Sequence, residues 1–393
     1  MTRLLKRLLF GLLTVLAVAV ILMVIIERRR SIDYMGERIG ADEPFYTAEV
    51  VASALESINA STNQSPPFRR DVHSKAHGCV RAEVSVLPDL GPELRHGVFE
   101  TPGRTYQAWI RYSSGNTNMQ HDQERDARGM AIKMMGVTGP TLLGSEGESG
   151  TQDFIMINSP VFFIRNVAEY AKFGRMLADG SRLGYFFGGG TPNVLRWHLR
   201  DMYLANATLK RAPDSLLHTQ YHSLTAYRLG PSTNIKFTAK SCTQQAVADV
   251  DRSKPNFLRD EMSAELGKGP ACFDLMVQPQ VAGKNMPVED PTVRWKESDS
   301  PFIAAARITV PQQTFDTGEQ NAFCEQLSFS PFHSLAAHEP IGGLNRLRRA
   351  VYLEDARYRR SMTADLGATP YRNPPEPTGW CLDLTGKACP ATP

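Results

Sequence analysis

Residues 346–360 read RLRRAVYLEDARYRR, and six of these fifteen positions are arginine in a chain whose net charge at pH 7 is only +3. On a helix, residues spaced at i, i+4, i+7 and i+11 share one face. Arg348, Tyr352, Asp355 and Arg359 have this spacing. Several residues between them are apolar, which favours a buried polar face. A solvated basic stripe is the alternative interpretation.

Tyr352 is the chemically unusual member of this face. A phenol with a pKa near 10 is neutral at pH 7. A guanidinium one turn away favours the phenolate, as does coordination to a metal ion. Tyrosine is one of the side chains that hold haem iron. The spacing therefore makes Tyr352 a candidate iron ligand, with Arg348 as its support.

A haem site also needs cations for the propionates and a polar group on the opposite face of the ring. Three upstream segments offer such groups: Arg70 and His73 in FRRDVHSKAHG (68–78), Arg111 and Ser113 in WIRYSS (109–114), and Asn158 with Phe162 and Phe163 in INSPVFFIRN (157–166). Each is ordinary when taken alone. A single histidine is more often structural, and an asparagine before Ser-Pro usually belongs to a turn.

Together these motifs occur in one order along the chain. RxxHxK, an RxS strand, DxRG, DFxxxNSPxFFxR and a late RxxxY resemble the haem-dependent catalase family, over about residues 67–365. DPTxxW (290–295) and FSP (329–331) add to the resemblance. It implies haem b as the cofactor and an antiparallel β-barrel surrounded by helices.

Carried over position by position, the resemblance implies three groups of site residues. The catalytic group is His73 as the distal acid–base residue, Asn158 as the distal amide and Ser113 as the holder of the His73 ring. The iron ligand is Tyr352, supported by Arg348. The remaining cofactor contacts are Arg70, Arg111 and Arg359 at the propionates, Phe163 against the macrocycle and Val72 along the approach.

The pattern of strands and helices agrees with an α+β fold. Alternating or β-branched runs at residues 79–87, 105–113, 129–137 and 154–164 predict strands. A helical stretch follows over 166–217, then further strands and the basic helix. We predict a folded domain over 67–365, a linker over 31–66 and a Pro-rich tail over 366–393.

The N-terminus has a different composition. Residues 8–26 carry no charge and lie between basic residues on both sides. An uncharged run of about 20 residues predicts a transmembrane helix. We therefore expect residues 1–30 to anchor the chain in a membrane, with the catalytic domain on the exported, periplasmic side.

Six cysteines contain no CxxC pair. Cys381 and Cys389 bracket a short loop and are candidates for a disulfide, whereas Cys79 and Cys324 are expected to be buried thiols. Three features depart from the typical family pattern: Met130 where an aromatic is usual, His77 where small residues are usual, and an extended loop over 140–152. The chain also ends soon after the Tyr352 segment.

The expected function is haem-dependent removal of hydrogen peroxide or organic hydroperoxides. One alternative is rearrangement of lipid hydroperoxides by an enzyme of the allene-oxide-synthase type. Another is a non-catalytic barrel that binds haem or lipid. The small net charge gives no reason to expect a nucleic-acid partner. A homo-oligomer is possible, and the electron donor is not specified by the sequence.

Overall fold

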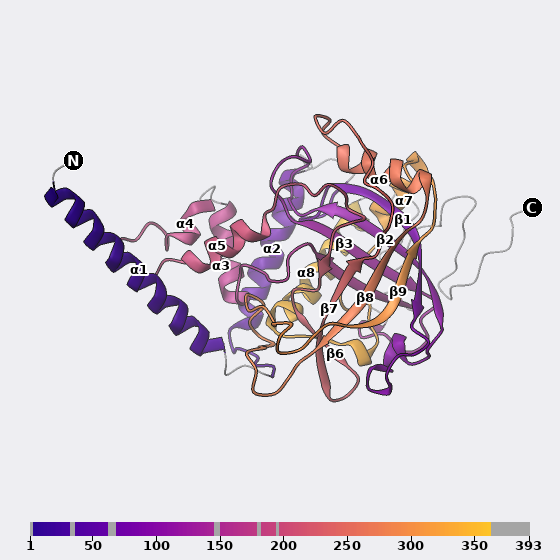
Figure 1. The fold of residues 1–393 in the computed structure, drawn as a ribbon, viewed down its shortest axis with the longest axis horizontal. Coiled ribbons are helices and arrows are strands. Elements are labelled where there is room, and N and C mark those ends of the chain that lie inside the picture. The colour runs from indigo at the N-terminus through magenta and orange to yellow at the C-terminus, as the bar shows by residue number, and fades with distance from the viewer. Residues whose placement is uncertain are drawn as a thin grey trace, which may run out of the picture.

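The computed structural model describes residues 3–31, 36–61, 68–144, 150–178, 182–193 and 196–362. Its centre is an antiparallel β-barrel (Figure 1). The strands are β1 (Ala76–Val86), β2 (Thr105–Ser114), β3 (Arg128–Met135), β4 (Thr151–Ile157), β5 (Tyr221–His222), β6 (Ala226–Leu229), β7 (Thr233–Ser241), β8 (Ala271–Pro279), β9 (Ile303–Val310) and β10 (Pro340–Ile341).

Pairing between β7 and β8 closes the barrel. Around the ring, the order is β7-β5-β4-β3-β2-β1-β9-β8, and β6 and β10 extend the sheet from β7. Side chains on alternate positions fill the interior, as in β1, where Val80, Ala82 and Val84 are fully buried. This period of two leaves the intervening side chains on the outer face.

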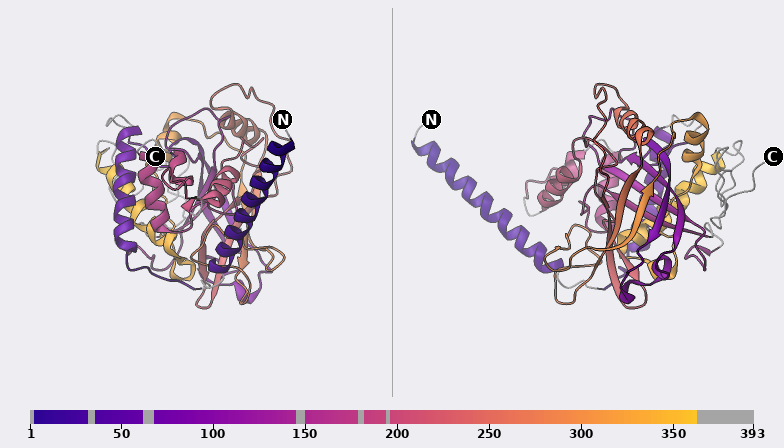
Figure 2. Two further views of the ribbon diagram at one scale, coloured as in Figure 1. Left: turned by 90° about the vertical axis from the view of Figure 1, so that its left-hand side faces the viewer. Right: turned by 45° about the vertical axis from the view of Figure 1, so that its right-hand side comes forward.

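One helix, α1 (Arg3–Ser31), projects away from the barrel (Figure 1). The other helices lie around the barrel: α2 (Glu43–Ser61), α3 (Val167–Ala178), α4 (Arg182–Phe186), α5 (Leu199–Thr208), α6 (Phe257–Lys268), α7 (Gly318–Gln326) and α8 (Gly343–Met362). In Figure 2, α2, α3 and α8 lie side by side. Val50, Val167 and Leu347 are among the buried residues that join these three helices.

The predicted strands and the basic helix are confirmed. The segment predicted as a linker contains α2, whose residues Val50, Ala54 and Ile58 are buried, so this part belongs to the folded domain. Its apolar residues recur every four positions, and one face of the helix therefore packs inward. The predicted tail over 366–393 lies outside the described residues.

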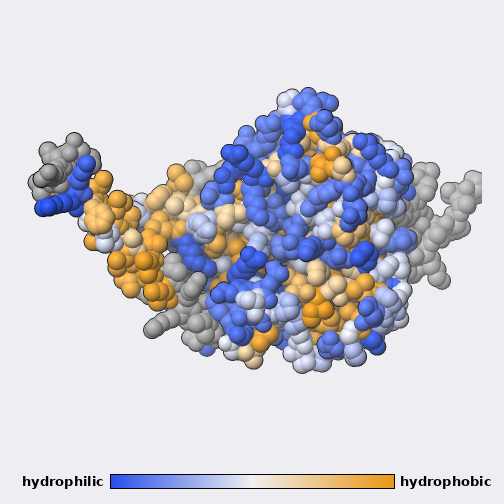
Figure 3. Space-filling view, in the orientation of Figure 1, coloured by the Kyte–Doolittle hydropathy of each residue, from blue (hydrophilic) through white to orange (hydrophobic). Residues whose placement is uncertain are grey.

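The predicted transmembrane span over residues 8–26 is not supported. Apolar side chains are exposed along α1 (Figure 3). Among the described residues, however, no helix is both long and apolar enough to cross a membrane.

The structure also corrects the cysteine assignments. Cys79 and Cys324 form a disulfide between β1 and α7 rather than remaining buried thiols, with their Cα atoms 5.6 Å apart. Cys242 and Cys272 form a second disulfide, with a Cα–Cα distance of 5.2 Å. Both separations lie in the usual range for a disulfide. The predicted Cys381–Cys389 pair lies outside the described residues.

Candidate active site

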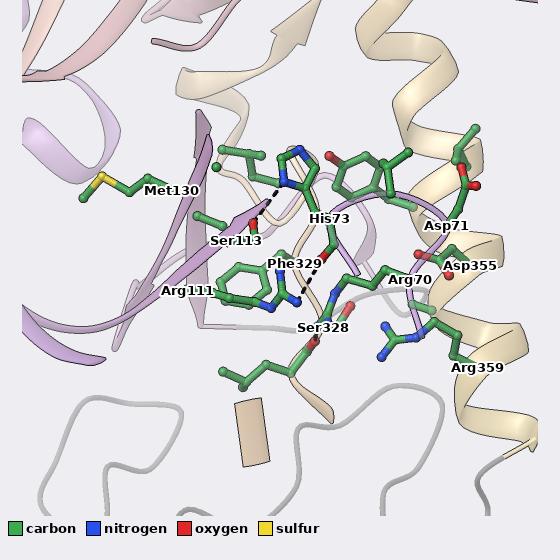
Figure 4. Close-up of a pocket in the computed structure, with 18 of the residues that line it drawn as sticks. Arg70, Asp71, His73, Arg111, Ser113, Met130, Ser328, Phe329, Asp355 and Arg359 are labelled. Carbon is green, nitrogen blue, oxygen red and sulfur yellow. Dashed lines mark hydrogen bonds between the residues drawn. The ribbon is translucent and has the colours of Figure 1, made fainter. Parts of the chain in front are cut away.

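A cavity lies on the outer face of the barrel, between the strands and α8 (Figure 4). Together with its opening to solvent it measures about 710 Å³. Its walls come from four parts of the chain: residues 70–73, the outer faces of β2–β4, residues 327–329 after α7, and α8. Val72, Ala131, Ile155, Phe329 and Val351 give it apolar surface.

His73 lies at the barrel side of this cavity in an unusual backbone conformation. Its φ is +59°, in the left-handed region that non-glycine residues rarely adopt. The Nδ1 atom lies 2.9 Å from the Ser113 hydroxyl oxygen, which leaves Nε2 available to a ligand in the cavity. Backbone strain of this kind persists only where the surroundings hold it, and it is common at active sites.

Gly129 explains how the imidazole fits. It pairs with Ser113 in the β2–β3 register. A Cβ added at Gly129 would lie 2.7 Å from two atoms of the His73 ring and 2.8 Å from the Ser113 oxygen. The absence of a side chain at this position therefore makes room for the ring. The DxRG motif contained Gly129, but its role was visible only once the register was known.

The electrostatic surroundings keep the His73 imidazole neutral. Burial, then Arg111, Arg348 and Arg70, lower its pKa to about 3. A neutral imidazole has a free lone pair with which to accept a proton, but a pKa this low makes it a weak base. The acid–base role assigned to His73 stays a prediction.

Tyr352 projects from α8 on the other side of the cavity. The Arg348 Nη2 atom donates to the Tyr352 hydroxyl over 3.4 Å. Arg348 is held in turn by the side-chain oxygens of Asn345, at 3.1 Å, and Thr225, at 3.3 Å. Burial alone would lower the pKa of Arg348, but Tyr352 and Tyr227 raise it above its usual value.

The three arginines assigned to the propionates converge at one end of the cavity (Figure 4). Arg70 and Arg111 contact the Glu325 carboxylate at 3.2 Å and 3.5 Å. Arg359 donates to the Glu325 backbone carbonyl over 2.7 Å. Burial alone would raise the pKa of Glu325. The guanidiniums of Arg111, Arg70 and Arg359 outweigh burial and lower this pKa below its usual value. Sequence reasoning missed Glu325, which carried no motif signal.

Two carboxyl groups also line the cavity. Burial raises the pKa of Asp71 to about 7, with a smaller contribution from Asp355. Burial likewise raises the pKa of Asp355, and its Oδ1 atom has no hydrogen-bond partner. Asp355 belonged to the predicted helix face without a role, and Asp71 was missed although it lies two residues before His73.

Arg348 reaches the cavity only through Tyr352, and two further predicted site residues do not line it. The Asn158 side-chain oxygen accepts the backbone N–H of Arg128 over 2.8 Å, so it joins the end of β4 to β3. Phe163 packs instead against Phe162 and Phe173, with ring centroids 4.8 Å and 5.3 Å away. Neither lines the cavity. Val72 does line it and is 39% exposed, consistent with a place on the approach.

The donor set fits a haem. A phenol and an imidazole lie on different sides of one cavity, and arginines gather at one end. The buried Nε of Arg111 has no hydrogen-bond partner, nor has Asp355 Oδ1. Buried polar atoms without partners are rare unless a ligand or water satisfies them.

Comparisons with known proteins find similarity to catalases and to a catalase-related peroxidase. A family model described as catalase matches residues 52–180. A catalase-related peroxidase from Mycolicibacterium paratuberculosis is 27% identical over 336 residues, covering 81% of this chain and 97% of the relative. Catalase A from Pseudomonas putida is 24% identical over 297 residues, covering 68% of this chain but 58% of the relative. The chain thus spans less than two thirds of the longer catalase.

Solved structures show the same fold. A fungal catalase superposes with a TM-score of 0.56 at 19% identity, covering 77% of this chain and 60% of that one. Catalase A from Saccharomyces cerevisiae gives a TM-score of 0.56 at 18% identity, covering 77% and 62%.

Proposed function

We propose that this chain is a member of the catalase family, which its similarity to the catalase family model and to a catalase-related peroxidase supports, and that it is a haem-dependent enzyme that reduces hydrogen peroxide or organic hydroperoxides. One observation carries the proposal. One side of the cavity holds His73, whose ring contacts the Ser113 hydroxyl. The other side holds Tyr352, whose hydroxyl accepts a hydrogen bond from Arg348. An acid–base group and an anionic iron ligand are the two protein functions that this chemistry requires.

The residues that would hold the cofactor are Tyr352 as the iron ligand, with Arg348 beside it, and Arg70, Arg111 and Arg359 at the carboxylates. When bound, a haem supplies the iron at which the O–O bond is reduced. The guanidiniums would neutralise the two propionates through charge-assisted hydrogen bonds. Phe163, which packs away from the cavity, is not part of this set.

His73 would carry the proton chemistry. Its neutral Nε2 atom accepts the proton of a hydroperoxide held in the cavity and returns it to the departing oxygen, while Ser113 fixes the ring through Nδ1. The Asn158 amide oxygen is bound to the Arg128 backbone N–H, so only its Nδ2 group could donate to such a hydroperoxide. Val72, Ile155 and the other apolar walls exclude water and offer room for an organic group as well as hydrogen peroxide.

The test is turnover by the full-length, haem-loaded protein and by His73→Ala. We expect a Soret band in both, and a loss of peroxide turnover of about 10²–10⁴-fold in the variant. His121→Ala serves as the control, because His121 contacts Ser253 and does not line the cavity. Equal turnover in all three proteins, or no haem uptake by the wild type, would contradict the proposal.

The same assay separates the alternatives. Oxygen release from hydrogen peroxide, or hydroperoxide consumption that requires an added reductant, supports the proposed reaction. Loss of a fatty-acid hydroperoxide without any reductant would instead support the rearranging type of enzyme.

We also propose that the domain folds in an oxidising compartment. The support is the pair of disulfides, which form and persist mainly outside the reducing cytosol. Thiol alkylation of protein from intact cells tests this. Labelling of Cys79 or Cys272 before any reduction would contradict the proposal.

A further inference from the structure

Arginines from separate parts of the chain donate hydrogen bonds to the C-terminal end of α7. Three consecutive backbone carbonyls each accept a guanidinium hydrogen bond: Glu325 from Arg359 at 2.7 Å, Gln326 from Arg360 at 3.4 Å, and Leu327 from Arg70 at 2.6 Å. The last carbonyls of a helix have no partner within it and carry partial negative charge. This helix end is therefore suited to bind cations.

The Glu325 side chain extends the same cluster to a further arginine. Its carboxylate contacts both Arg70 and Arg111. Burial first, and then the neighbouring arginines, lower the pKa values of these two guanidiniums. Like charges at this separation repel one another, so the cluster needs the anionic and dipolar partners that α7 provides.

A covalent bond fixes this helix end to the barrel. Cys324, which directly precedes Glu325, is bonded to Cys79 on β1. Cys79 is in turn paired with Arg111 in the β1–β2 register. The disulfide thus connects the α7 end, which carries Glu325, to the strand pair that carries Arg111. One further contact joins the two elements, because the Gln320 Nε2 atom donates to the Cys79 carbonyl over 2.7 Å.

We propose that the end of α7, held to β1 by the Cys79–Cys324 disulfide, is a positioning element that sets Arg70, Arg111 and Arg359 to bind the two carboxylates of a porphyrin. This rests on the proposed haem function. A site that is ordered before its ligand arrives binds more tightly, because less conformational entropy is lost on binding. Without the disulfide, the helix end would move and the arginines would spread apart.

The experiment compares two disulfide deletions in the full chain. Cys79→Ala/Cys324→Ala removes the bond beside the arginines, and Cys242→Ala/Cys272→Ala removes the bond between the end of β7 and β8, which does not line the cavity. The probes are iron-free protoporphyrin IX and its dimethyl ester, titrated by fluorescence below the unfolding temperature. The iron-free ring removes any contribution from Tyr352 ligation, and the ester removes the carboxylate charges.

We expect the first deletion to weaken protoporphyrin IX binding by about tenfold or more, corresponding to one displaced charge-assisted hydrogen bond. The ester should bind the deletion and the wild type alike. The control deletion should leave both affinities unchanged. Equal affinity of the acid for the first deletion and the wild type would overturn the positioning role, as would an equal loss for acid and ester.

Two further outcomes are separable. If the wild type binds neither protoporphyrin IX nor haem, the proposed function fails as well. If the first deletion does not fold, a second experiment replaces it. The Cys242→Ala/Cys272→Ala protein is folded with its Cys79–Cys324 disulfide intact. That disulfide is then reduced with dithiothreitol, which supplies two electrons and two protons. Unchanged acid affinity after that reduction would also overturn the positioning role.

Discussion

At the scale of single residues, His73 has an acid–base behaviour that solution chemistry would not predict. Its pKa of about 3 means that the ring is protonated only as the pH falls toward 3. An unperturbed imidazole has a pKa near 6.5. Asp71 lines the same cavity with a pKa raised to about 7, so the test uses Asp71→Asn, in which we expect kcat/KM of the haem-loaded enzyme for peroxide to stay level between about pH 5 and 8. A pH profile with a midpoint near 6.5 would contradict this assignment.

Gly129 offers a test of ring placement that leaves His73 itself intact. Gly129→Ala puts a methyl group within 2.7 Å of the imidazole and should displace it. We expect turnover to fall by about 10²-fold, as misplacement by an ångström can cost. Gly174→Ala is the control, because its nearest neighbour would be the Ser53 hydroxyl at 3.6 Å. Steady-state assays and circular dichroism measure both effects, and an unimpaired Gly129→Ala enzyme would refute the tight fit.

Asn158 should behave as a structural residue. Asn158→Ala leaves the buried Arg128 N–H without its partner. We expect the free energy of unfolding to fall by about 1–3 kcal/mol, measured in denaturant, with little change in turnover per haem. A large loss of turnover at unchanged stability would restore the catalytic role that the sequence suggested.

At the scale of elements, α8 divides its arginines by face largely as predicted. Arg348 and Arg359 face the site, whereas Arg346 pairs with Glu37, Glu43 and Glu289. Arg360 lies off this face, yet it is buried and donates to the end of α7. The helical period gives the face of each residue, but it does not say which faces α7 will cover.

The two tyrosines of α8 test this division. Tyr352→Phe removes the hydroxyl that Arg348 supports, so haem binding should be lost or the absorption spectrum altered. Tyr358→Phe should leave the spectrum unchanged, because its hydroxyl donates to Asn59 over 2.5 Å, away from the cavity. Absorption spectra of the two haem-reconstituted variants give the comparison. Identical native spectra would exclude Tyr352 as the ligand.

Most elements could be predicted because their signals are local. Strand alternation and the spacing within 346–360 depend on residues close together in sequence. The errors involve distant partners. Cys79 and Cys324 are separated by 245 positions, and Asn158 is directed toward Arg128 by the β3–β4 pairing. The buried stripe of α2 had a readable period of four, but the surrounding segment 31–66 is mixed in composition and ends in STNQSPP, which favoured a linker.

At the scale of the whole molecule, a buried carboxyl on α6 should make stability depend on pH. Burial, and then Glu265, raise the pKa of Glu261 to about 9. A folded-state pKa above the unfolded value of about 4.5 gives a contribution that is fully present below pH 4.5 and lost as the pH rises through 9. The folded protein therefore favours the neutral acid at position 261.

Glu261→Gln removes this dependence while keeping the shape of the side chain. We expect its thermal midpoint, relative to the wild type, to increase steadily from pH 5 to pH 8.5. Thermal melts at four pH values measure the difference. Glu297→Gln, at an exposed position, should follow the wild type throughout. A constant offset between wild type and Glu261→Gln would show that Glu261 ionises normally.

Strand β2 alone separates the core of the barrel from the cavity at this point. Tyr112 on β2 is fully buried in the core, while its neighbours Arg111 and Ser113 face the cavity. Deleting one residue here would turn every later side chain of the strand to the opposite face. Relatives of this protein should therefore tolerate length changes in the exposed loop over 281–284, after β8, but not within β2. We therefore expect β2 to change by substitution rather than by insertion or deletion.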